Sequence, residues 1–358
     1  MAWRLAVTVV LLAVGLQACA PARAPAGGNA PAVAAPSPSA GALAAPSAPV
    51  APRELQPVKI ATTEPQDMAW IIYAIAAESG IAASEGYAFE LVSATINASI
   101  PAIMSGEMGY TAQIASGMRA GAQGADLRGV AFFMDAPLQS LVVRPDIRQA
   151  SDLVGQSIGV STSGATAHTA TVQMMESLGV REDQVNWAFL GAQSARFAAL
   201  EQGLVQGAAL VAPVDLQVQR EGRYRILARA ADVVRIPFVG LATSTSRIAQ
   251  RPDEVKGVIR AILRTVDFIR QQPAEANASA ARWLHSDDPD LIGASMDQVR
   301  AVLTPAGAPD PAGFRHELGA IQKLANLPAP PRPDQVVDFR LLEEVQAELG
   351  LPVGALRD

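Results

Sequence analysis

The apolar positions of the chain follow three successive patterns. Residues 5–16 form an apolar run without charged residues behind Arg4, and residues 20–57 are almost all Ala, Pro, Gly and Ser with no period. From Val58 onwards, short apolar runs alternate with longer amphipathic segments. Short runs bounded by Gly or polar residues predict strands, and longer segments with a helical period predict helices. The globular body is therefore predicted to begin at about Val58.

The body is predicted to alternate strands and helices. Strands are expected at residues 58–62, 89–92, 110–113, 130–134, 141–143, 157–160, 185–190, 208–211 and 238–242. Helices are expected at residues 68–79, where Asp67 is the N-cap, and at 100–105, 166–178, 194–202, 252–271 and 274–283. Several helices stop at Gly, which readily adopts the left-handed conformation that ends a helix. This alternation predicts an α/β fold with mainly parallel sheets.

The first two segments predict an export signal and a tether. The run at 5–16 is shorter than the ~20 residues of a membrane-spanning helix and has the length of a secretory h-region. The motif Leu16-Gln17-Ala18-Cys19 then resembles the lipobox of bacterial lipoproteins. This resemblance implies a signal peptide at 1–19, lipidation of Cys19 and a lipid anchor facing the periplasm or the cell exterior. The alternative is an ordinary signal peptide with an incidental cysteine. Residues 20–57 bury too little apolar surface to fold and predict a disordered tether.

Composition excludes several classes of protein. The chain has 358 residues, 17% of them charged, and a net charge of −6, whereas nucleic-acid binders need a basic face. Cys19 is the only cysteine, and the three histidines, His168, His285 and His316, are far apart in sequence. No disulfide can form within one chain, and zinc or iron–sulfur sites need a cluster of such ligands. We therefore expect no metal and no cofactor.

Ligands of open α/β sheets bind beyond the carboxyl ends of the strands, so the segments that follow the strands supply the candidate site. These segments are rich in hydroxyls, amides and Gly and contain no Arg or Lys. The candidate residues are Thr62, Thr63, Glu64, Met68, Thr95, Asn97, Thr111, Gln113, Phe133, Ser161, Thr162, Gly164, Ala165 and Thr166.

Some neighbours of these segments have two interpretations. Residues 161–166 precede a helix, so their free N–H groups and the helix dipole predict a cradle for a polar or anionic group. The alternative is an ordinary helix cap with its hydroxyls in water. Trp70, Tyr73 and His168 either contact ligand or pack in the core, and Asp135 is either a ligand contact or a surface charge.

Four stretches of the body together resemble substrate-binding proteins of bacterial ABC importers, in the nitrate/sulfonate/taurine and thiamine-pyrimidine-precursor superfamily. They are AAESGI and EGYAFEL within residues 76–91, DLVGQSIGV at 152–160, LEQGLVQGAA at 200–209 with Pro213, and VDFRLL at 337–342. The chain departs from the family at Gly109 and Gln206, where members often carry Asp.

The resemblance implies a two-lobed periplasmic-binding-protein fold of type II, with two parallel-rich sheets joined by two crossing strands. Lobe I comprises 58–141 and 238–358, lobe II comprises 142–237, and Pro145 and Pro237 lie near the crossings. The implied function is a monomeric receptor that binds a small organic molecule between the lobes and delivers it to an ABC permease and its ATPase. The expected ligand is a sulfonate, a pyrimidine precursor or an aromatic acid.

Two other functions stay open. One is a ligand-sensing module for a membrane kinase. The other is an enzyme similar to the pyrimidine synthases of the same superfamily, which carry a cysteine-rich motif. The only cysteine here lies in the exported leader, so the favoured hypothesis is a receptor that catalyses no reaction.

Overall fold

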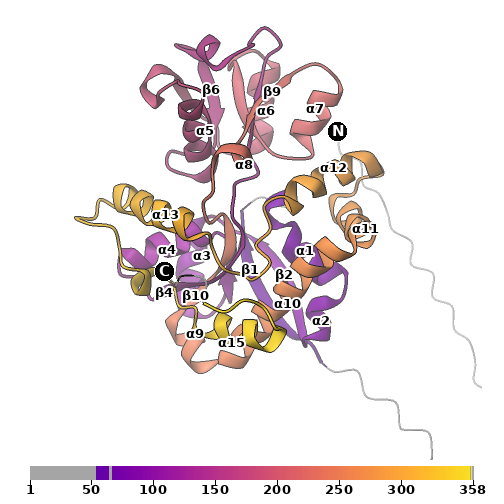
Figure 1. The fold of residues 1–358 in the computed structure, drawn as a ribbon, viewed down its shortest axis with the longest axis vertical. Helices are drawn as coiled ribbons and strands as arrows, with labels where there is room; N and C mark the ends of the chain where they lie inside the picture. Colours follow the sequence, from indigo (N-terminus) through magenta and orange to yellow (C-terminus); the bar gives the residue numbers. More distant parts are fainter. Residues whose placement is uncertain (1–53, 64–66, 355, 357–358) are drawn as a thin grey trace, which may run out of the picture. The chain divides into compact units, whose positions relative to one another are not determined.

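The computed structural model describes residues 54–63, 67–354 and 356 (Figure 1). The predicted signal peptide, Cys19, the tether up to residue 53 and Glu64 lie outside these residues. Among the helices that are described, none is long and apolar enough to cross a bilayer.

The first sheet contains five strands in the order β2-β1-β3-β10-β4. Their bounds are β1 (Gln56–Thr62), β2 (Tyr87–Ser93), β3 (Tyr110–Thr111), β4 (Leu127–Met134) and β10 (Val239–Ser244). β1 is parallel to β2 and β3, whereas β10 is antiparallel to β3 and β4. β1 starts two residues before the predicted Val58, because Gln56 and Pro57 pair with Tyr87 and Ala88.

The second sheet repeats this arrangement in the order β7-β6-β8-β5-β9. Its strands are β5 (Ser140–Val143), β6 (Ser157–Val160), β7 (Asn186–Phe189), β8 (Gly207–Leu210) and β9 (Arg225–Arg229). β6 is parallel to β7 and β8, and β5 is antiparallel to β8 and β9. β9 is not predicted from the sequence pattern; it has an arginine at each end and lies at the edge of the sheet.

The chain passes between the two sheets twice. Residues 135–139 connect β4 to β5, and residues 230–238, which include α8 (Ala230–Val233), connect β9 to β10. Pro237 lies within the second connection, whereas Pro145 lies just beyond β5. The predicted α/β fold with two parallel-rich sheets and two crossing segments is confirmed.

The remaining helices cover the sheets. Those before residue 144 or after residue 238 are η1 (Met68–Trp70), α1 (Ile71–Glu78), α2 (Ile81–Ser84), α3 (Ile96–Ser105), α4 (Ile114–Ala122), α9 (Thr245–Gln250), α10 (Pro252–Gln271), α11 (Pro273–Leu284), α12 (Pro289–Arg300), α13 (Pro311–Leu324), α14 (Pro333–Val336) and α15 (Arg340–Leu349). Those in between are η2 (Ala150–Leu153), α5 (Thr166–Ser177), η3 (Glu182–Gln184), α6 (Gln193–Glu201) and α7 (Val214–Arg220).

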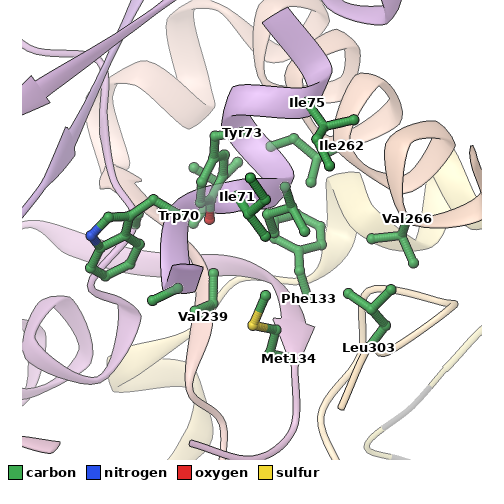
Figure 2. Packing of buried hydrophobic residues seen from close by; sticks show 14 of the residues in the cluster. Trp70, Ile71, Tyr73, Ile75, Phe133, Met134, Val239, Ile262, Val266 and Leu303 are labelled. Atoms are coloured by element: carbon green, nitrogen blue, oxygen red, sulfur yellow. The ribbon is translucent and has the colours of Figure 1, made fainter. Parts of the chain in front are cut away.

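The largest core cluster lies where α1, α10 and α11 pack together beside the first sheet. Tyr73 is fully buried there, and its hydroxyl donates to the Gly240 carbonyl oxygen at 2.7 Å. Its ring meets Phe133 edge-on, with centroids 6.3 Å apart (Figure 2). Trp70 lies at the edge of this cluster, and its indole is directed away from Ile71 and Phe133 (Figure 2). Tyr73 is therefore a core residue, whereas Trp70 borders the core.

Candidate functional site

A cavity of about 580 Å³ lies where segments of both sheets converge. Its wall includes η1 and α4 from the first half of the chain, the crossing segments, the 161–167 segment with α5, and one face of α13. Cavities of about 300–1,000 Å³ are typical of small-molecule sites. Its walls come from segments that are distant in sequence, so the cavity exists only in the folded protein.

Nine of the fourteen predicted site residues line this cavity. They are Thr63, Thr95, Asn97, Gln113, Ser161, Thr162, Gly164, Ala165 and Thr166. All of them come from segments that follow strands. In both halves of the chain, the segments beyond the carboxyl ends of the strands therefore meet at this cavity, as expected for open α/β sheets.

The other five predicted residues do not line the cavity. Met68 and Phe133 are fully buried in the core cluster of the first sheet, where apolar neighbours surround them. Thr62 and Thr111 are buried strand residues, and the Thr111 hydroxyl accepts from the Gln113 backbone N–H at 3.2 Å. Glu64 is outside the described residues. The structure therefore places Met68, Phe133, Thr62 and Thr111 among buried residues outside the wall of this cavity.

The 161–166 segment is a turn that is stabilised by hydrogen bonds to neighbouring residues of the same half of the chain. Gly164 has a φ of +72°, and its N–H donates to Nδ1 of His168 at 3.2 Å. The Ala165 N–H donates to the Thr162 carbonyl at 3.1 Å. The Ala165 amide is thus already paired, which corrects the expectation that it is free for ligand. A Cβ at Gly164 would lie 2.8 Å from the Leu324 side chain, so α13 closely approaches this turn.

His168 supports the turn from behind the cavity wall. It is buried, and its ring meets Trp187 and Phe189 edge-on at centroid distances of 4.9 and 5.3 Å. Because Nδ1 accepts the Gly164 N–H, the neutral ring carries its proton on Nε2. Burial lowers the pKa of His168, and the Glu182 carboxylate opposes this shift. His168 therefore positions the turn and is not part of the cavity wall.

Two arginines line the cavity, although the strand-end segments contain none. Arg119 comes from α4 and Arg196 from α6. Arg196 is buried, and its guanidinium donates to the carbonyls of Ala209, at 2.8 Å, and Gly191. A sequence signal existed for Arg119, since Gln113, Ser116 and Arg119 recur every three residues and so share one helix face. The cavity wall therefore contains two arginines, together with the carboxyl groups of Asp67 and Glu317.

Unpartnered polar atoms concentrate at the cavity. In the described part of the chain, six buried side-chain polar atoms lack a hydrogen-bond partner, and four belong to cavity-lining residues. These are the Trp70 indole N–H and one amide atom each of Gln113, Gln139 and Gln173. A buried polar group without a partner costs about 1–3 kcal/mol. A ligand that pairs with these groups would recover that free energy.

Asp135, the remaining candidate, pairs with another residue of the protein. Asp135 accepts from Arg235 at 3.0 Å, an ion pair that joins the two crossing segments. Burial raises the pKa of Asp135, and the Arg235 charge opposes this. Across the described residues, no group of three His, Cys, Asp or Glu side chains is placed to hold a metal ion.

The family model described as NMT1/THI5 like matches residues 68–276, more than half of the chain. The chain belongs to the NMT1/THI5-like family. The family model confirms the predicted family, and the predicted type II fold is confirmed because solved structures of the same fold cover most of the chain. Among curated protein sequences, none gives a significant match to this NMT1/THI5-like chain.

Three solved structures illustrate the similarity. The alkanesulfonate-binding protein SsuA from Xanthomonas axonopodis pv. citri, bound to MOPS, has 16% identity and a TM-score of 0.62, covering 79% of this NMT1/THI5-like chain and 96% of its own. The periplasmic nitrate-binding protein NrtA from Synechocystis PCC 6803 has 13% identity and a TM-score of 0.66. The match covers 84% of this chain and 90% of NrtA. The desulfurization enzyme DSZB has 15% identity and a TM-score of 0.58. The match covers 82% of this chain and 99% of DSZB.

Proposed function

We propose that this protein is an extracytoplasmic receptor that captures a small organic molecule in the cavity and delivers it to an ABC importer. The observation that carries the proposal is the concentration of unpartnered polar groups in one cavity formed by both halves of the chain. Trp70 and Gln139 are more than nine-tenths buried, so water has little access to hydrogen-bond with their unpartnered polar atoms. Such a wall is built to pair with a ligand.

The architecture supports capture by closure. The cavity wall includes the crossing residues Gln139, Ile236, Pro237 and Phe238. Because the backbone passes between the halves through these two segments, a small rotation about them would open or close the cavity. Two structural neighbours, the alkanesulfonate-binding protein SsuA and the nitrate-binding protein NrtA, are binding proteins, which supports a binding role.

The ligand is expected to carry an acidic end. Arg119 and Arg196 bring positive charge to the wall, and guanidinium groups bind carboxylates and sulfonates through paired N–H donors. The apolar faces of Trp70, Phe238 and Ile321 suit a carbon skeleton, planar or not. Sulfonates, aromatic acids and acidic pyrimidine precursors satisfy both requirements.

The proposal is tested by a thermal-shift screen of the protein against small sulfonates, nitrate, aromatic carboxylates and pyrimidines. For a compound that binds, titration calorimetry on Thr162→Ala and Thr166→Ala should show affinity reduced several-fold to about a hundredfold, at about 0.5–3 kcal/mol per lost bond. Thr245→Ala, outside the cavity wall, is the matched control. Unchanged affinity in both turn variants would mean that the polar end of the ligand binds elsewhere.

We propose further that Cys19 carries the lipid anchor, that the anchored protein is a monomer, and that its partners are a permease and an ATPase. The lipobox resemblance and the Ala/Pro-rich tether support the anchor. Cys19→Ser should release the protein from membranes and leave ligand binding unchanged. Intact mass showing an unmodified Cys19, or cleavage elsewhere, would refute the anchor. Copurification with a membrane kinase in place of a permease would favour the sensor alternative.

An enzyme is the second candidate, since the fold is shared with the desulfurization enzyme DSZB. The described cavity wall includes no cysteine, and its serines and threonines are not paired with a histidine base. We therefore propose binding without turnover. Mass spectrometry of a bound compound after prolonged incubation should show it unchanged, and conversion would establish the enzyme.

A further inference from the structure

Two charged residues face the cavity without a partner. Arg119 on α4 and Glu317 on α13 both line it, and the two helices pack against each other. Glu317 is 8% exposed. Among the described residues, neither side chain forms a hydrogen bond or an ion pair. The Arg119 charge is still close enough to lower the pKa of Glu317, against the larger effect of burial, which raises it to about 7.

This arrangement is unusual within the molecule. Of the three buried acidic residues in the described chain, Asp215 accepts hydrogen bonds from Ser140 and Arg229, and Glu254 from Tyr110 and two arginines. Glu317 is the exception, although it lies near an arginine. A buried carboxyl that serves only structure is normally paired in this way. The missing partner of Glu317 therefore belongs to whatever occupies the cavity.

We propose that the cavity binds a dipolar head group, of the amino-acid or aminosulfonate type, with its anionic group on Arg119 and its ammonium group on Glu317. This inference rests on the proposed receptor function and narrows its ligand class. The two protein charges are near each other but not in contact, so the ligand charges must be separated by only a few atoms. The carbon body of the ligand then extends into the rest of the cavity, toward Trp70.

The other groups in the wall fit a dipolar ligand. The Gln113 side-chain amide lies at the N-cap of α4, the helix that carries Arg119. The Gln173 side-chain amide lies on α5, where it also contacts His316 of α13 at 2.9 Å. Each retains one unpartnered amide atom. Amides supply both donors and acceptors, so they can accept from an ammonium group or donate to an acid oxygen. A purely anionic ligand would leave the Glu317 carboxyl unpaired or force it to take up a proton.

The test uses pairs of compounds that differ only by the ammonium group. The pairs are β-alanine and propanoate, taurine and ethanesulfonate, and L-phenylalanine and 3-phenylpropanoate. In at least one pair, the compound with the ammonium group should bind roughly ten- to hundredfold more tightly. This affinity ratio corresponds to the free energy of one charge-assisted hydrogen bond. Glu317→Gln should abolish this preference, and the simple acid should bind the variant at least as tightly as wild type, because no carboxylate then has to be neutralised. Arg119→Gln should weaken binding of both members.

Glu343→Gln on α15 is the matched control, because Glu343 lies outside the cavity wall. Circular dichroism establishes that each variant is folded. The affinity ratio within each pair is measured on the wild-type protein, so it does not depend on the folding of any variant. Retention of the preference in Glu317→Gln would overturn the inference, as would equal binding of both members of every pair. If only simple acids or uncharged compounds bind, the inference fails and the receptor function stands. If no compound of either screen binds, both fail.

Proton linkage gives an independent readout on the wild-type protein. An ammonium group beside Glu317 stabilises its carboxylate, so binding near pH 7 should release protons, whereas a simple acid should cause proton uptake. Calorimetry in buffers of different ionisation enthalpy measures the sign. The other charged or titratable residues of the wall are Asp67, Arg196 and His316. Persistence of proton release in Glu317→Gln would assign it to one of these and overturn the role of Glu317.

Discussion

At the scale of single residues, the pH dependence of stability should depend on Glu317. Burial raises its pKa from 4.5 to about 7 in the folded protein, with Arg119 opposing the shift. The neutral carboxyl is therefore favoured on folding. Its stabilisation is complete below about pH 4.5 and is lost as the pH rises through about 7.

Glu317→Gln removes this loss, because the amide is neutral at every pH. At about 1.4 kcal/mol per pKa unit, the variant should gain up to about 3 kcal/mol over wild type between pH 4.5 and pH 8. Urea unfolding at both values measures the difference, with Glu343→Gln as control. A gap between variant and wild type that does not change with pH would contradict the prediction.

His168 should have the opposite pH dependence. Burial lowers its pKa, so the folded protein favours the neutral ring that accepts the Gly164 N–H. This stabilisation is present above about pH 6.5 and is lost as the pH falls through the lowered pKa of the folded state.

Two substitutions of His168 separate its hydrogen bond from its titration. His168→Asn places an acceptor near the position of Nδ1 and does not titrate, whereas His168→Leu removes the acceptor and costs about 1–3 kcal/mol. Thermal melts at about pH 5 and 8 should show a weaker pH dependence for both variants, with Asn the more stable. Equal loss in both variants would mean that ring packing against Trp187 matters more than the hydrogen bond.

At the scale of elements, α13 depends on a close contact with the second crossing segment. A Cβ at Gly313 would fall against the carbonyl oxygen of Arg235, too close for the backbone to tolerate. Five residues of α13, among them Glu317 and Leu324, line the cavity. Displacement of the helix should therefore open the cavity.

Gly313→Ala should lower both stability and ligand affinity, because the helix must shift away from residue 235. Gly319→Ala in the same helix is the matched control, since its Cβ meets nothing within 4 Å. That change should stabilise the protein by about 0.5–1 kcal/mol through helix propensity. Melting temperature and ligand titration measure both variants, and a neutral Gly313→Ala would refute the close contact.

At the scale of the whole molecule, ligand binding should draw the two halves together. Contacts already join them away from the crossing segments, with Gln173 of α5 near His316 of α13 and Gln298 of α12 donating to Asp215 of α7. Ligand at about a hundred times its dissociation constant should add about 2.7 kcal/mol to stability by mass action.

Small-angle scattering with a compound from the screen should show a smaller radius of gyration than without it. Gln173→Ala removes the α5–α13 contact and should weaken the affinity for that compound, whereas Gln322→Ala, on α13 but outside the cavity wall, should not. Identical scattering with and without bound compound would show that capture does not need closure.

The sequence by itself determined many of the elements and much of the ligand-facing backbone. Asp67 accepts from the Ala69 N–H, and Gly80 and Gly106 adopt left-handed conformations, so the predicted N-cap and helix ends are confirmed. Strand β6 and helix α10 have the predicted bounds. These features depend on neighbours a few residues apart, which periodicity and capping chemistry reveal directly.

Only the tertiary structure decided which side chains share the cavity. Residues 119 and 317 are almost two hundred positions apart, and no local pattern places them on facing helices. Met68 and Phe133 follow the same strand-end rule as Gln113, yet the packing of α1 and α10 buries them in the core. Side-chain direction and the closeness of distant elements depend on the whole fold, because a local sequence pattern contains no information about which remote segment will cover it.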